Sequence, residues 1–181
     1  MSAPLRGDAL VARVHELVRD VPDFPTPGVG FKDITPLLAD AEAFAAVVAE
    51  IAGSVDGPVD LVAGTEARGF ILAAPVAVAL GAGFVPIRKH GKLPGPTAAE
   101  EYTLEYGTAT VEVHPFTVPE GSRVLVVDDV LATGGTAAAT IRLLERCGAH
   151  VVGLSFLVEL GFLAGRDVLA GHRVESLITV N

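Results

Sequence analysis

Residues 123–136 read RVLVVDDVLATGGT, and the fold of the chain can be worked out from this stretch. The Val and Leu residues at its start are typical of a strand that is buried on both faces. Two adjacent carboxylates, Asp128 and Asp129, come directly after that strand, and an Ala-rich segment at residues 137–144 predicts a helix. A strand, an acid pair, a glycine-containing loop and a helix in this order predict a phosphate-binding loop with two acids beside it.

The loop between the acids and the helix has the composition of an anion site. Its glycines let backbone N–H groups approach a phosphate, and the helix N-terminus adds a favourable dipole. The GK[ST] ending of a Walker A loop is missing, which favours a terminal monophosphate over a nucleoside triphosphate. Two carboxylates repel phosphate, so their partners are expected to be hydroxyl groups, a cation, or both, as in a sugar phosphate. The phosphate-binding residues predicted here are Ala132, Thr133, Gly134, Gly135 and Thr136.

Length and composition predict a single domain over residues 1–181. Half of the residues are hydrophobic, and the formal net charge is −9, which argues against nucleic acid as a partner. The chain has one cysteine, Cys147, and no signal peptide is evident at its start, so we expect a reducing, cytoplasmic location. Residues 70–87 are uncharged, but Pro and Gly interrupt them. They predict a buried helix followed by a strand, and no membrane span.

Hydrophobic periodicity and breakers predict an alternation of helices and strands. Such an alternation is typical of an α/β fold with a mostly parallel central sheet and helices on both faces. Residues 31–38 are expected to form a loop or short strand, and residues 88–101 are too long and irregular for an ordinary connection, which indicates a lid. The expected helices are 8–20, 41–52, 69–80, 137–144 and 162–169, and the expected strands are 59–63, 84–87, 108–113, 123–127, 151–157 and 174–180.

Three loops leave strands at the same predicted edge of the sheet, where ligands bind in such folds. They are residues 64–68, the segment from residue 88 onward, and residues 128–136. Arg68 stands at the start of a predicted helix. Three further cations stand close together in a chain that has 13 basic and 22 acidic residues, which indicates a second anion site. These cations are Arg88, Lys89 and Lys92, whereas His90 between them has no evident partner.

The stretch VLVVDDVLATGGT resembles the phosphoribosyl-pyrophosphate motif of the type I phosphoribosyltransferases. The resemblance implies that Asp128 and Asp129 hold the ribose hydroxyls and that residues 132–136 hold the 5-phosphate. The sequence GTEARGF at residues 64–70 looks like the pyrophosphate loop of that family. It implies that Glu66, Ala67 and Arg68 contact the pyrophosphate, together with the three cations after residue 87. It also implies a cis peptide bond between Glu66 and Ala67.

Two further stretches resemble the adenine phosphoribosyltransferases within that family. Residues 23–38, DFPTPGVGFKDITPLL, look like the base-binding segment, and residues 88–107, RKHGKLPGPTAAEEYTLEYG, look like the mobile catalytic loop. The similarity runs from about residue 21 to residue 160 and implies an N-terminal hood at residues 1–38. By this resemblance Glu105 approaches N7 of the purine and takes part in proton transfer, and Tyr106 positions the loop. The implied adenine contacts are Val29, Gly30, Phe31 and Lys32.

The implied reaction is a step of purine salvage. Adenine and 5-phosphoribosyl 1-pyrophosphate give AMP and pyrophosphate, with Mg²⁺ bound mainly through substrate and water and with no assigned protein ligand. The family also implies a homodimer. Two alternatives remain open: transfer to another purine base such as guanine, hypoxanthine or xanthine, and a transcription regulator that senses phosphoribosyl pyrophosphate. A regulator would need a helix-turn-helix or a basic face, and the sequence has neither.

Overall fold

The computed structural model describes residues 5–103 and 107–181 of the chain. The chain divides into two compact units, Met1–Gly53 and Ser54–Asn181. The segment expected to bind a base lies in the first unit. All three loops expected to bind phosphate, ribose and pyrophosphate lie in the second.

The first unit contains helices and one small hairpin. It consists of α1 (Gly7–Leu17), β1 (Arg19–Val21), β2 (Phe31–Asp33), α2 (Thr35–Ala39) and α3 (Ala41–Gly53). The three helices pack against one another, and β1 pairs antiparallel with β2. The helix expected over residues 8–20 was therefore too long, and residues 31–38 divide into a strand and a short helix. Strand β1 was missed because its partner lies about a dozen residues away, so no local pattern reveals the pairing.

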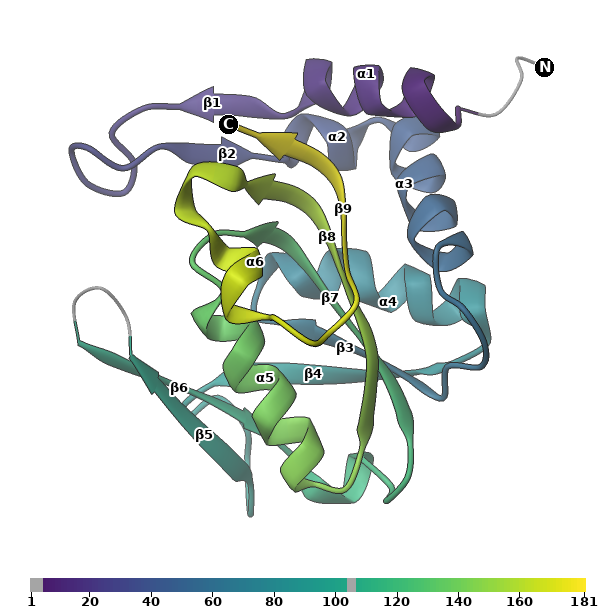
Figure 1. Cartoon of the computed structure of the whole chain (residues 1–181), viewed down its shortest axis with the longest axis vertical. Coiled ribbons are helices and arrows are strands. Elements are labelled where there is room, and N and C mark those ends of the chain that lie inside the picture. The colour runs from purple at the N-terminus through teal and green to yellow at the C-terminus, as the bar shows by residue number, and fades with distance from the viewer. Residues whose placement is uncertain (1–4, 104–106) are drawn as a thin grey trace. The chain divides into compact units, whose positions relative to one another are not determined.

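The second unit is built on a seven-stranded sheet with the order β5-β6-β4-β3-β7-β8-β9 (Figure 1). Strands β4, β3, β7, β8 and β9 are parallel, whereas β6 and β5 are antiparallel to their neighbours. The expected mostly parallel sheet is confirmed. Its elements are β3 (Leu61–Thr65), α4 (Arg68–Leu80), β4 (Gly83–Lys89), β5 (Ala98–Thr103), β6 (Thr108–Val113), η1 (Pro115–Thr117), β7 (Arg123–Leu131), α5 (Gly135–Arg146), β8 (His150–Leu160), η2 (Gly161–Leu163), α6 (Gly165–Val168) and β9 (Val174–Val180).

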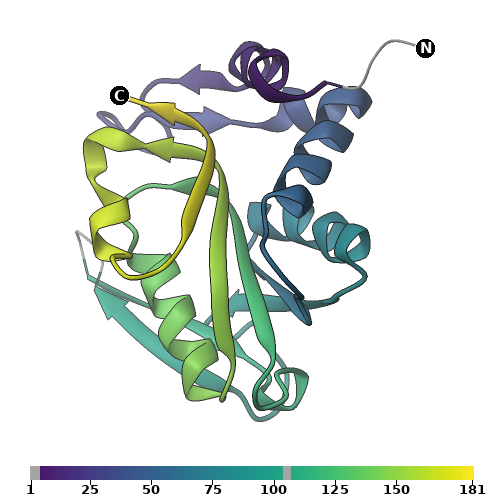
Figure 2. The same cartoon turned by 45° about the vertical axis from the view of Figure 1, so that its right-hand side comes forward.

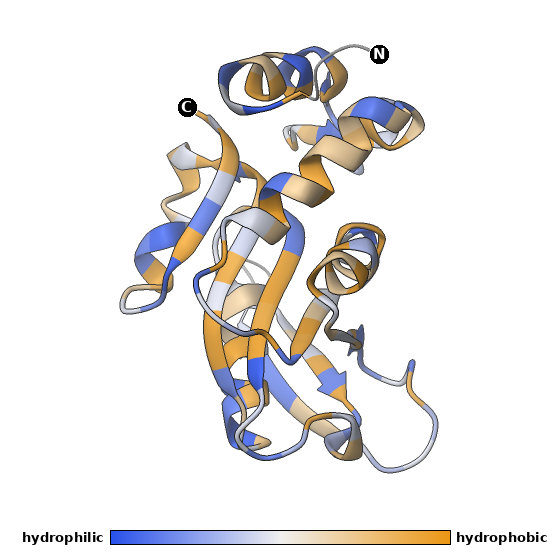
Figure 3. Cartoon of the chain, turned by 90° about the vertical axis from the view of Figure 1, so that its right-hand side faces the viewer, coloured by the Kyte–Doolittle hydropathy of each residue, from blue (hydrophilic) through white to orange (hydrophobic). Residues whose placement is uncertain are grey.

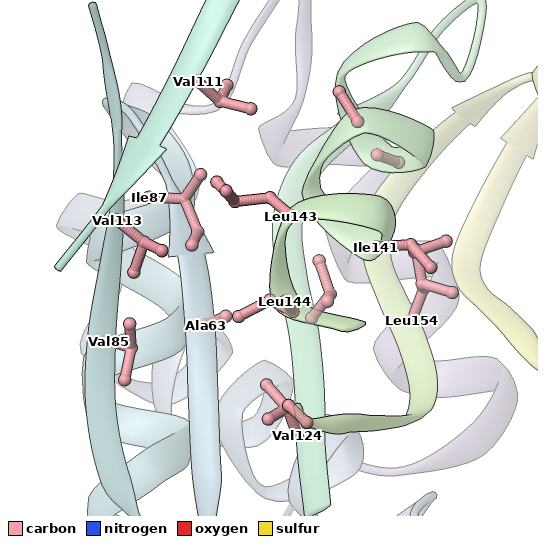
Figure 4. Close-up of a cluster of buried hydrophobic side chains, with 14 of the residues drawn as sticks. Ala63, Val85, Ile87, Val111, Val113, Val124, Ile141, Leu143, Leu144 and Leu154 are labelled. Atoms are coloured by element: carbon pink, nitrogen blue, oxygen red, sulfur yellow. The ribbon is translucent and has the colours of Figure 1, made fainter. Parts of the chain in front are cut away.

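Helices α4 and α5 cover opposite faces of this sheet (Figure 2). The connections from β3 to β4 and from β7 to β8 lead away from the sheet centre in opposite directions. Because such crossovers are right-handed, their helices fall on opposite faces. On the α5 side, Leu143 and Leu144 point toward Ile87 and Ala63 in the main hydrophobic cluster (Figure 4). Long stretches of the central strands consist of hydrophobic residues, which are orange in Figure 3.

Strand β7 is longer than the sequence indicated, and this changes the position of the acid pair. Strand β3 pairs with β7 only as far as Val127, whereas β8 pairs with it up to Leu131. Asp128 and Asp129 therefore lie within the last part of β7 and do not follow it. They lie where the neighbouring strand on one side has already ended, so β3 does not pair with β7 at these positions.

The segment expected to be an irregular lid is partly a strand. Strand β4 continues to Lys89, and β5 pairs with β6 over six residue pairs from Ala98 to Thr103. The sequence of β5, AAEEYT, has little β-propensity of its own, so the pairing with β6 determines its conformation. Over the described parts of the chain, no helix has both the length and the apolar character needed to cross a membrane.

Candidate functional site

Polar groups gather at the carboxyl edge of the parallel strands of the second unit. The loop that holds Glu66 and Ala67 follows β3, Arg88 and Lys89 are the last residues of β4, and β7 carries the acid pair in its last part and is followed by the glycine loop. The order β4-β3-β7 makes these three strands neighbours. The fold therefore brings together three segments that are separated in sequence by up to about 60 residues.

The glycine loop and the start of α5 form the walls of a pocket. Its lining includes Asp128, residues 132–136 and Phe156, and it encloses about 330 Å³ of space that opens to solvent. Gly134 caps α5 in a left-handed conformation with a φ of 81°, so the backbone turns sharply into the helix. The twelve-residue helix α5 presents its N-terminus to this pocket. The five predicted phosphate-binding residues thus share one anion-favouring environment.

The acid pair is held in two different environments. Asp129 is buried, with 5% of its surface exposed, and its N–H donates a 2.8 Å hydrogen bond to Oδ1 of Asp128. Burial and, secondly, the charge of Asp129 raise the pKa of Asp128 to about 8, while the hydroxyl of Thr65 and the N–H of Asp129 oppose the rise. Two adjacent carboxyl groups in this position favour partners that donate hydrogen bonds or carry positive charge.

Arg68 connects the β3 loop to the acid pair. Its Nε atom lies 2.8 Å from Oδ2 of Asp129, and the two side chains form an ion pair. Within the described residues, this buried Oδ2 atom accepts no hydrogen bond of good geometry. Asp129 therefore has an oxygen with remaining capacity for a hydroxyl group or a cation.

Glu66 organises the cations at the end of β4. Its Oε2 atom accepts hydrogen bonds from Nε of Arg88 at 2.9 Å and from the N–H of Lys89 at 3.0 Å. These two donors, the N–H of Lys89 first, hold the pKa of the Glu66 carboxyl below its ordinary value. The peptide bond between Glu66 and Ala67 is cis. The Glu66 carboxylate is bound to Arg88 and Lys89. Only the backbone of Glu66 is therefore available to contact an anion.

The turn after β4 has an anchor that the sequence did not reveal. Nδ1 of His90 lies 2.6 Å from Oε1 of the buried Glu112, and the N–H of Gly91 donates to Oε2 of the same carboxylate at 3.1 Å. The N–H of Lys92 closes the turn on the carbonyl of Lys89 at 3.2 Å. The expectation that His90 lacks a partner was wrong, because Glu112 is far away in sequence and reaches it only through the pairing of β4 with β6.

The residues expected to contact adenine lie together in the first unit. The N–H of Val29 donates to the carbonyl of Thr26, and its own carbonyl accepts from the N–H of Phe24, so Val29 shapes the turn before Gly30. Phe31 packs edge-on against Phe24, with ring centroids 5.0 Å apart. The side chain of Lys32 forms an ion pair with Asp20, so its ammonium group is already engaged by a carboxylate.

Two predicted residues, Glu105 and Tyr106, lie outside the described residues.

Sequence reasoning missed two residues that shape the site, Gly69 and Thr65. A Cβ atom at Gly69 would stand 2.7 Å from Oδ1 of Asp128 and 2.9 Å from Oγ1 of the buried Thr65. Only a glycine lets α4 begin this close to the acid pair. A glycine at the start of an otherwise good helix was the one local signal for this close approach.

Comparison with known proteins agrees with this geometry. The family model described as "Phosphoribosyl transferase domain" matches residues 35–167. An adenine phosphoribosyltransferase of Thermobifida fusca is 61% identical over 168 residues, which cover 92% of this chain and 96% of that protein. The chain therefore belongs to the phosphoribosyltransferase family.

Solved structures resemble the chain over nearly its whole length. The crystal structure of adenine phosphoribosyltransferase from Thermoanaerobacter pseudethanolicus has a TM-score of 0.91 and 49% identity, and the match covers 94% of this chain and 99% of that one. The enzyme from Giardia lamblia, solved in complex with 9-deazaadenine, has a TM-score of 0.89 and 40% identity, with 94% and 98% covered. The relatives to which this phosphoribosyltransferase is similar are thus adenine phosphoribosyltransferases.

Proposed function

We propose that this chain transfers the 5-phosphoribosyl group from 5-phosphoribosyl 1-pyrophosphate to adenine and forms AMP and pyrophosphate. It is a glycosyltransferase of purine salvage. The observation that carries the proposal is the juxtaposition of Arg68, the acid pair and the glycine loop at one sheet edge, in a chain 61% identical to an adenine phosphoribosyltransferase. The relatives favour neither another purine base nor a transcription regulator.

The ribose 5-phosphate part of the substrate fits the pocket at the end of β7. Residues 132–136 hold the 5-phosphate, and Asp128 and Asp129 hold the ribose hydroxyls. When the bond at C1 breaks, positive charge develops on the sugar. The Asp129 carboxylate stabilises that charge at short range, and Asp128 adds to this effect when it is ionised.

The pyrophosphate leaves with several negative charges, and cations offset them. Arg68, which follows β3, and the cations at the end of β4, which are Arg88, Lys89 and Lys92, supply this charge from the side of β7 on which β3 and β4 lie. The backbone of Glu66 and Ala67 lies between them. The Glu66 carboxylate positions Arg88 and Lys89 through its two hydrogen bonds. An oriented guanidinium binds a phosphate oxygen pair more strongly than a mobile one does.

The base is recognised by the segment Val29, Gly30, Phe31 and Lys32. Phe31 stacks on the purine ring, and main-chain groups read the amino group and the adjacent ring nitrogen. The edge-on packing of Phe24 limits the orientations that the Phe31 ring adopts. Glu105 transfers a proton at N7 of the purine, and Tyr106 positions the loop that carries it.

Mg²⁺ is the proposed cofactor, and the acid pair fits such an ion. A hard cation that takes oxygen ligands would favour the ionised form of Asp128, whose pKa is raised, and could contact Oδ2 of Asp129 beside its ion pair with Arg68. Substrate oxygens and water would hold most of the ion's coordination sphere, with Asp128 and Asp129 close to it. When bound, the ion offsets the negative charge of the pyrophosphate.

We further propose that the protein is a cytoplasmic homodimer. Helix α4 presents Ile71 and Val78 on one face, and Val78 is 81% exposed. These residues are seven positions apart, which places them on the same side of the helix. Phe84 of the adjoining strand β4 is exposed as well. A second copy of the chain that covers this face would remove its apolar surface from water.

A direct assay tests the proposed reaction. The protein is incubated with Mg²⁺, 5-phosphoribosyl 1-pyrophosphate and one purine base at a time, and the nucleotides are resolved by chromatography. We expect AMP from adenine and little product from guanine, hypoxanthine or xanthine. Turnover of one of those bases in preference to adenine would overturn the assignment of the base, and no nucleotide with any base would overturn the proposed reaction.

A further inference from the structure

The loop that forms the phosphate pocket rests directly on the backbone of a later segment. A Cβ atom built at Gly165, the first residue of α6, would overlap the carbonyl oxygen of Ala132 and stand 2.9 Å from the backbone nitrogen of Gly134. In return, a Cβ atom at Gly134 would overlap the carbonyl oxygen of Gly165. The two backbones are therefore in contact, and neither position has room for a side chain.

Gly165 requires glycine because of space and not because of its backbone conformation. Its φ lies outside the left-handed range, unlike that of Gly134, which is 81°. An alanine at position 165 is therefore compatible with the local conformation and differs only by one methyl group. That methyl group would meet backbone atoms of the loop, which yield less readily than the end of a flexible side chain.

The residue next to Gly165 is fixed by four side-chain hydrogen bonds, of which the longest, 3.4 Å, runs from Nη2 of Arg166 to the hydroxyl of Ser176. Arg166 donates from Nε to Oε1 of Glu159 at 3.0 Å and from Nη2 to Oε2 at 2.5 Å. Its Nη1 atom donates to the carbonyl of Val174 at 2.6 Å. Glu159 is 7% exposed near the end of β8, and Val174 begins β9. A bidentate pair at a largely buried carboxylate holds a guanidinium in one orientation, so Gly165 is tied to two strands of the sheet.

These contacts form a continuous chain of interactions from the sheet to the phosphate pocket. It runs from Glu159 and Val174 through Arg166 to Gly165, and from there to the loop at Ala132 and Gly134. The loop binds an anion well only if its N–H groups already point toward the phosphate. A rigid support behind the loop lowers the cost of ordering it when the phosphate arrives.

We propose that Gly165 and Arg166 are positioning residues that hold the 5-phosphate loop in its binding shape and thereby set the affinity for phosphorylated sugar. The inference rests on the proposed function, because that function assigns the 5-phosphate to residues 132–136. Neither residue contacts the ligand, and both act through the backbone of the loop. The segment after β8 is thus a part of the phosphate site, although it carries none of the sequence motif.

The test is the variant Gly165→Ala, compared with Gly153→Ala as a matched control. Gly153 lies in β8, and a Cβ atom there would meet its neighbours at 3.6 Å or more, an ordinary contact. We expect Gly165→Ala to raise the Kd for ribose 5-phosphate by about tenfold or more, since charge-assisted bonds to the phosphate are misaligned. The KM for 5-phosphoribosyl 1-pyrophosphate should rise similarly, and the KM for adenine should stay within about twofold of wild type.

A second variant keeps the test decisive if Gly165→Ala fails to fold. Arg166→Lys retains the positive charge and loses the bidentate geometry, so it should produce the same selective rise with a smaller amplitude. Unchanged binding of ribose 5-phosphate by a folded Gly165→Ala variant would overturn the inference, as would an equal rise in the KM for adenine. If Gly165→Ala does not fold, unchanged binding by Arg166→Lys overturns it instead.

The same measurements separate this inference from the proposed function. Wild-type protein that binds ribose 5-phosphate and converts adenine to AMP supports the proposed function whatever the variants do. Wild-type protein that fails to bind ribose 5-phosphate overturns the assignment of residues 132–136 and the inference with it. A wild-type protein that binds ribose 5-phosphate but uses another base contradicts only the choice of adenine.

Discussion

The Nε atom of Arg68 lies 2.8 Å from the Oδ2 atom of Asp129, and this ion pair joins the loop assigned to pyrophosphate with the acids assigned to ribose. Arg68 opens α4, and Asp129 lies near the end of β7. We expect pyrophosphate binding by Arg68 to compete with this pair. The proposed function therefore predicts that the pyrophosphate and ribose groups of the substrate are coupled through this contact.

Replacing Arg68 should lower both stability and catalysis. Arg68→Gln leaves the buried Asp129 carboxylate without its cation, so we expect the free energy of unfolding to fall by on the order of 2 kcal/mol. We also expect kcat to fall by about 100-fold or more, because charge on the leaving group is no longer offset. Urea denaturation and steady-state kinetics measure the two effects.

The double variant Arg68→Gln/Asp129→Asn provides the control for that experiment. It removes the unpaired charge, so stability should largely return while activity stays low. A double variant that is as unstable as Arg68→Gln alone would show that the ion pair has no role in the stability of the site.

Asp128 should make stability depend on pH. Its pKa is raised from 3.8 to about 8, chiefly by burial and then by the charge of Asp129. The folded protein therefore binds more protons than the unfolded chain between these values, and the free energy of unfolding falls as pH rises across this window. The stabilising contribution is complete below the lower value and is lost as pH passes the upper one.

The variant Asp128→Asn has no proton to lose at this position. The difference in Tm between this variant and wild type should become more positive from about pH 5 to about pH 9. Thermal unfolding at several pH values measures it, with Asp8→Asn on the exposed surface of α1 as the control. A difference in Tm that is constant over this range would contradict the raised pKa.

Glu66 should affect pyrophosphate binding more than it affects the base. Glu66→Gln keeps an acceptor for the N–H of Lys89 and loses the ion pair with Arg88. In the reverse reaction, from AMP and pyrophosphate, we expect the KM for pyrophosphate to rise by roughly three- to tenfold. The KM for AMP should change little. Glu101→Gln on the exposed side of β5 is the control, and an equal change in both variants would argue against a positioning role.

Tyr102 links the β5–β6 hairpin to the phosphate pocket. The hydroxyl of Thr136 donates to the hydroxyl of Tyr102 at 3.1 Å, so a residue of the predicted phosphate site is bound to the strand that precedes Glu105. Tyr102→Phe should raise the KM for 5-phosphoribosyl 1-pyrophosphate about threefold and lower stability by about 1 kcal/mol. In a double-mutant cycle with Thr136→Val the two changes should be less than additive. Full additivity would mean that the hydroxyl pair carries no coupling.

The apolar face of α4 tests the proposed dimer. Val78→Asp places a charge where a second copy would pack, so the variant should sediment as a monomer at concentrations where wild type is a dimer. Phe116→Asp is a suitable control, because Phe116 is 78% exposed and belongs to another element, η1. Wild-type protein that sediments as a monomer, or a Val78→Asp variant that stays dimeric, would contradict the proposed interface.

Local sequence patterns were enough to predict the central elements of the fold and the kind of ligand. The buried run before the acid pair, the glycine loop and the helix after it are such patterns, and neighbours within a few residues of one another fix them. The same holds for the helix and strand within residues 70–87, which form α4 and β4. Composition and motif chemistry then predicted a sugar phosphate.

Which side chains act together depends on long-range packing, and no local pattern predicted it. The partners of Asp129, Glu66 and His90 are Arg68, Arg88 and Glu112, which stand on other strands or loops and up to about 60 positions away. Strand β5 also depends on a partner, because its own residues do not favour a strand. These pairings follow from the order of the strands in the sheet and from the register in which neighbouring strands pair. Both are determined by the packing of the whole sheet. The backbone contact of Gly165 with Ala132 has the same origin, since a pattern within one segment does not encode the space beside another.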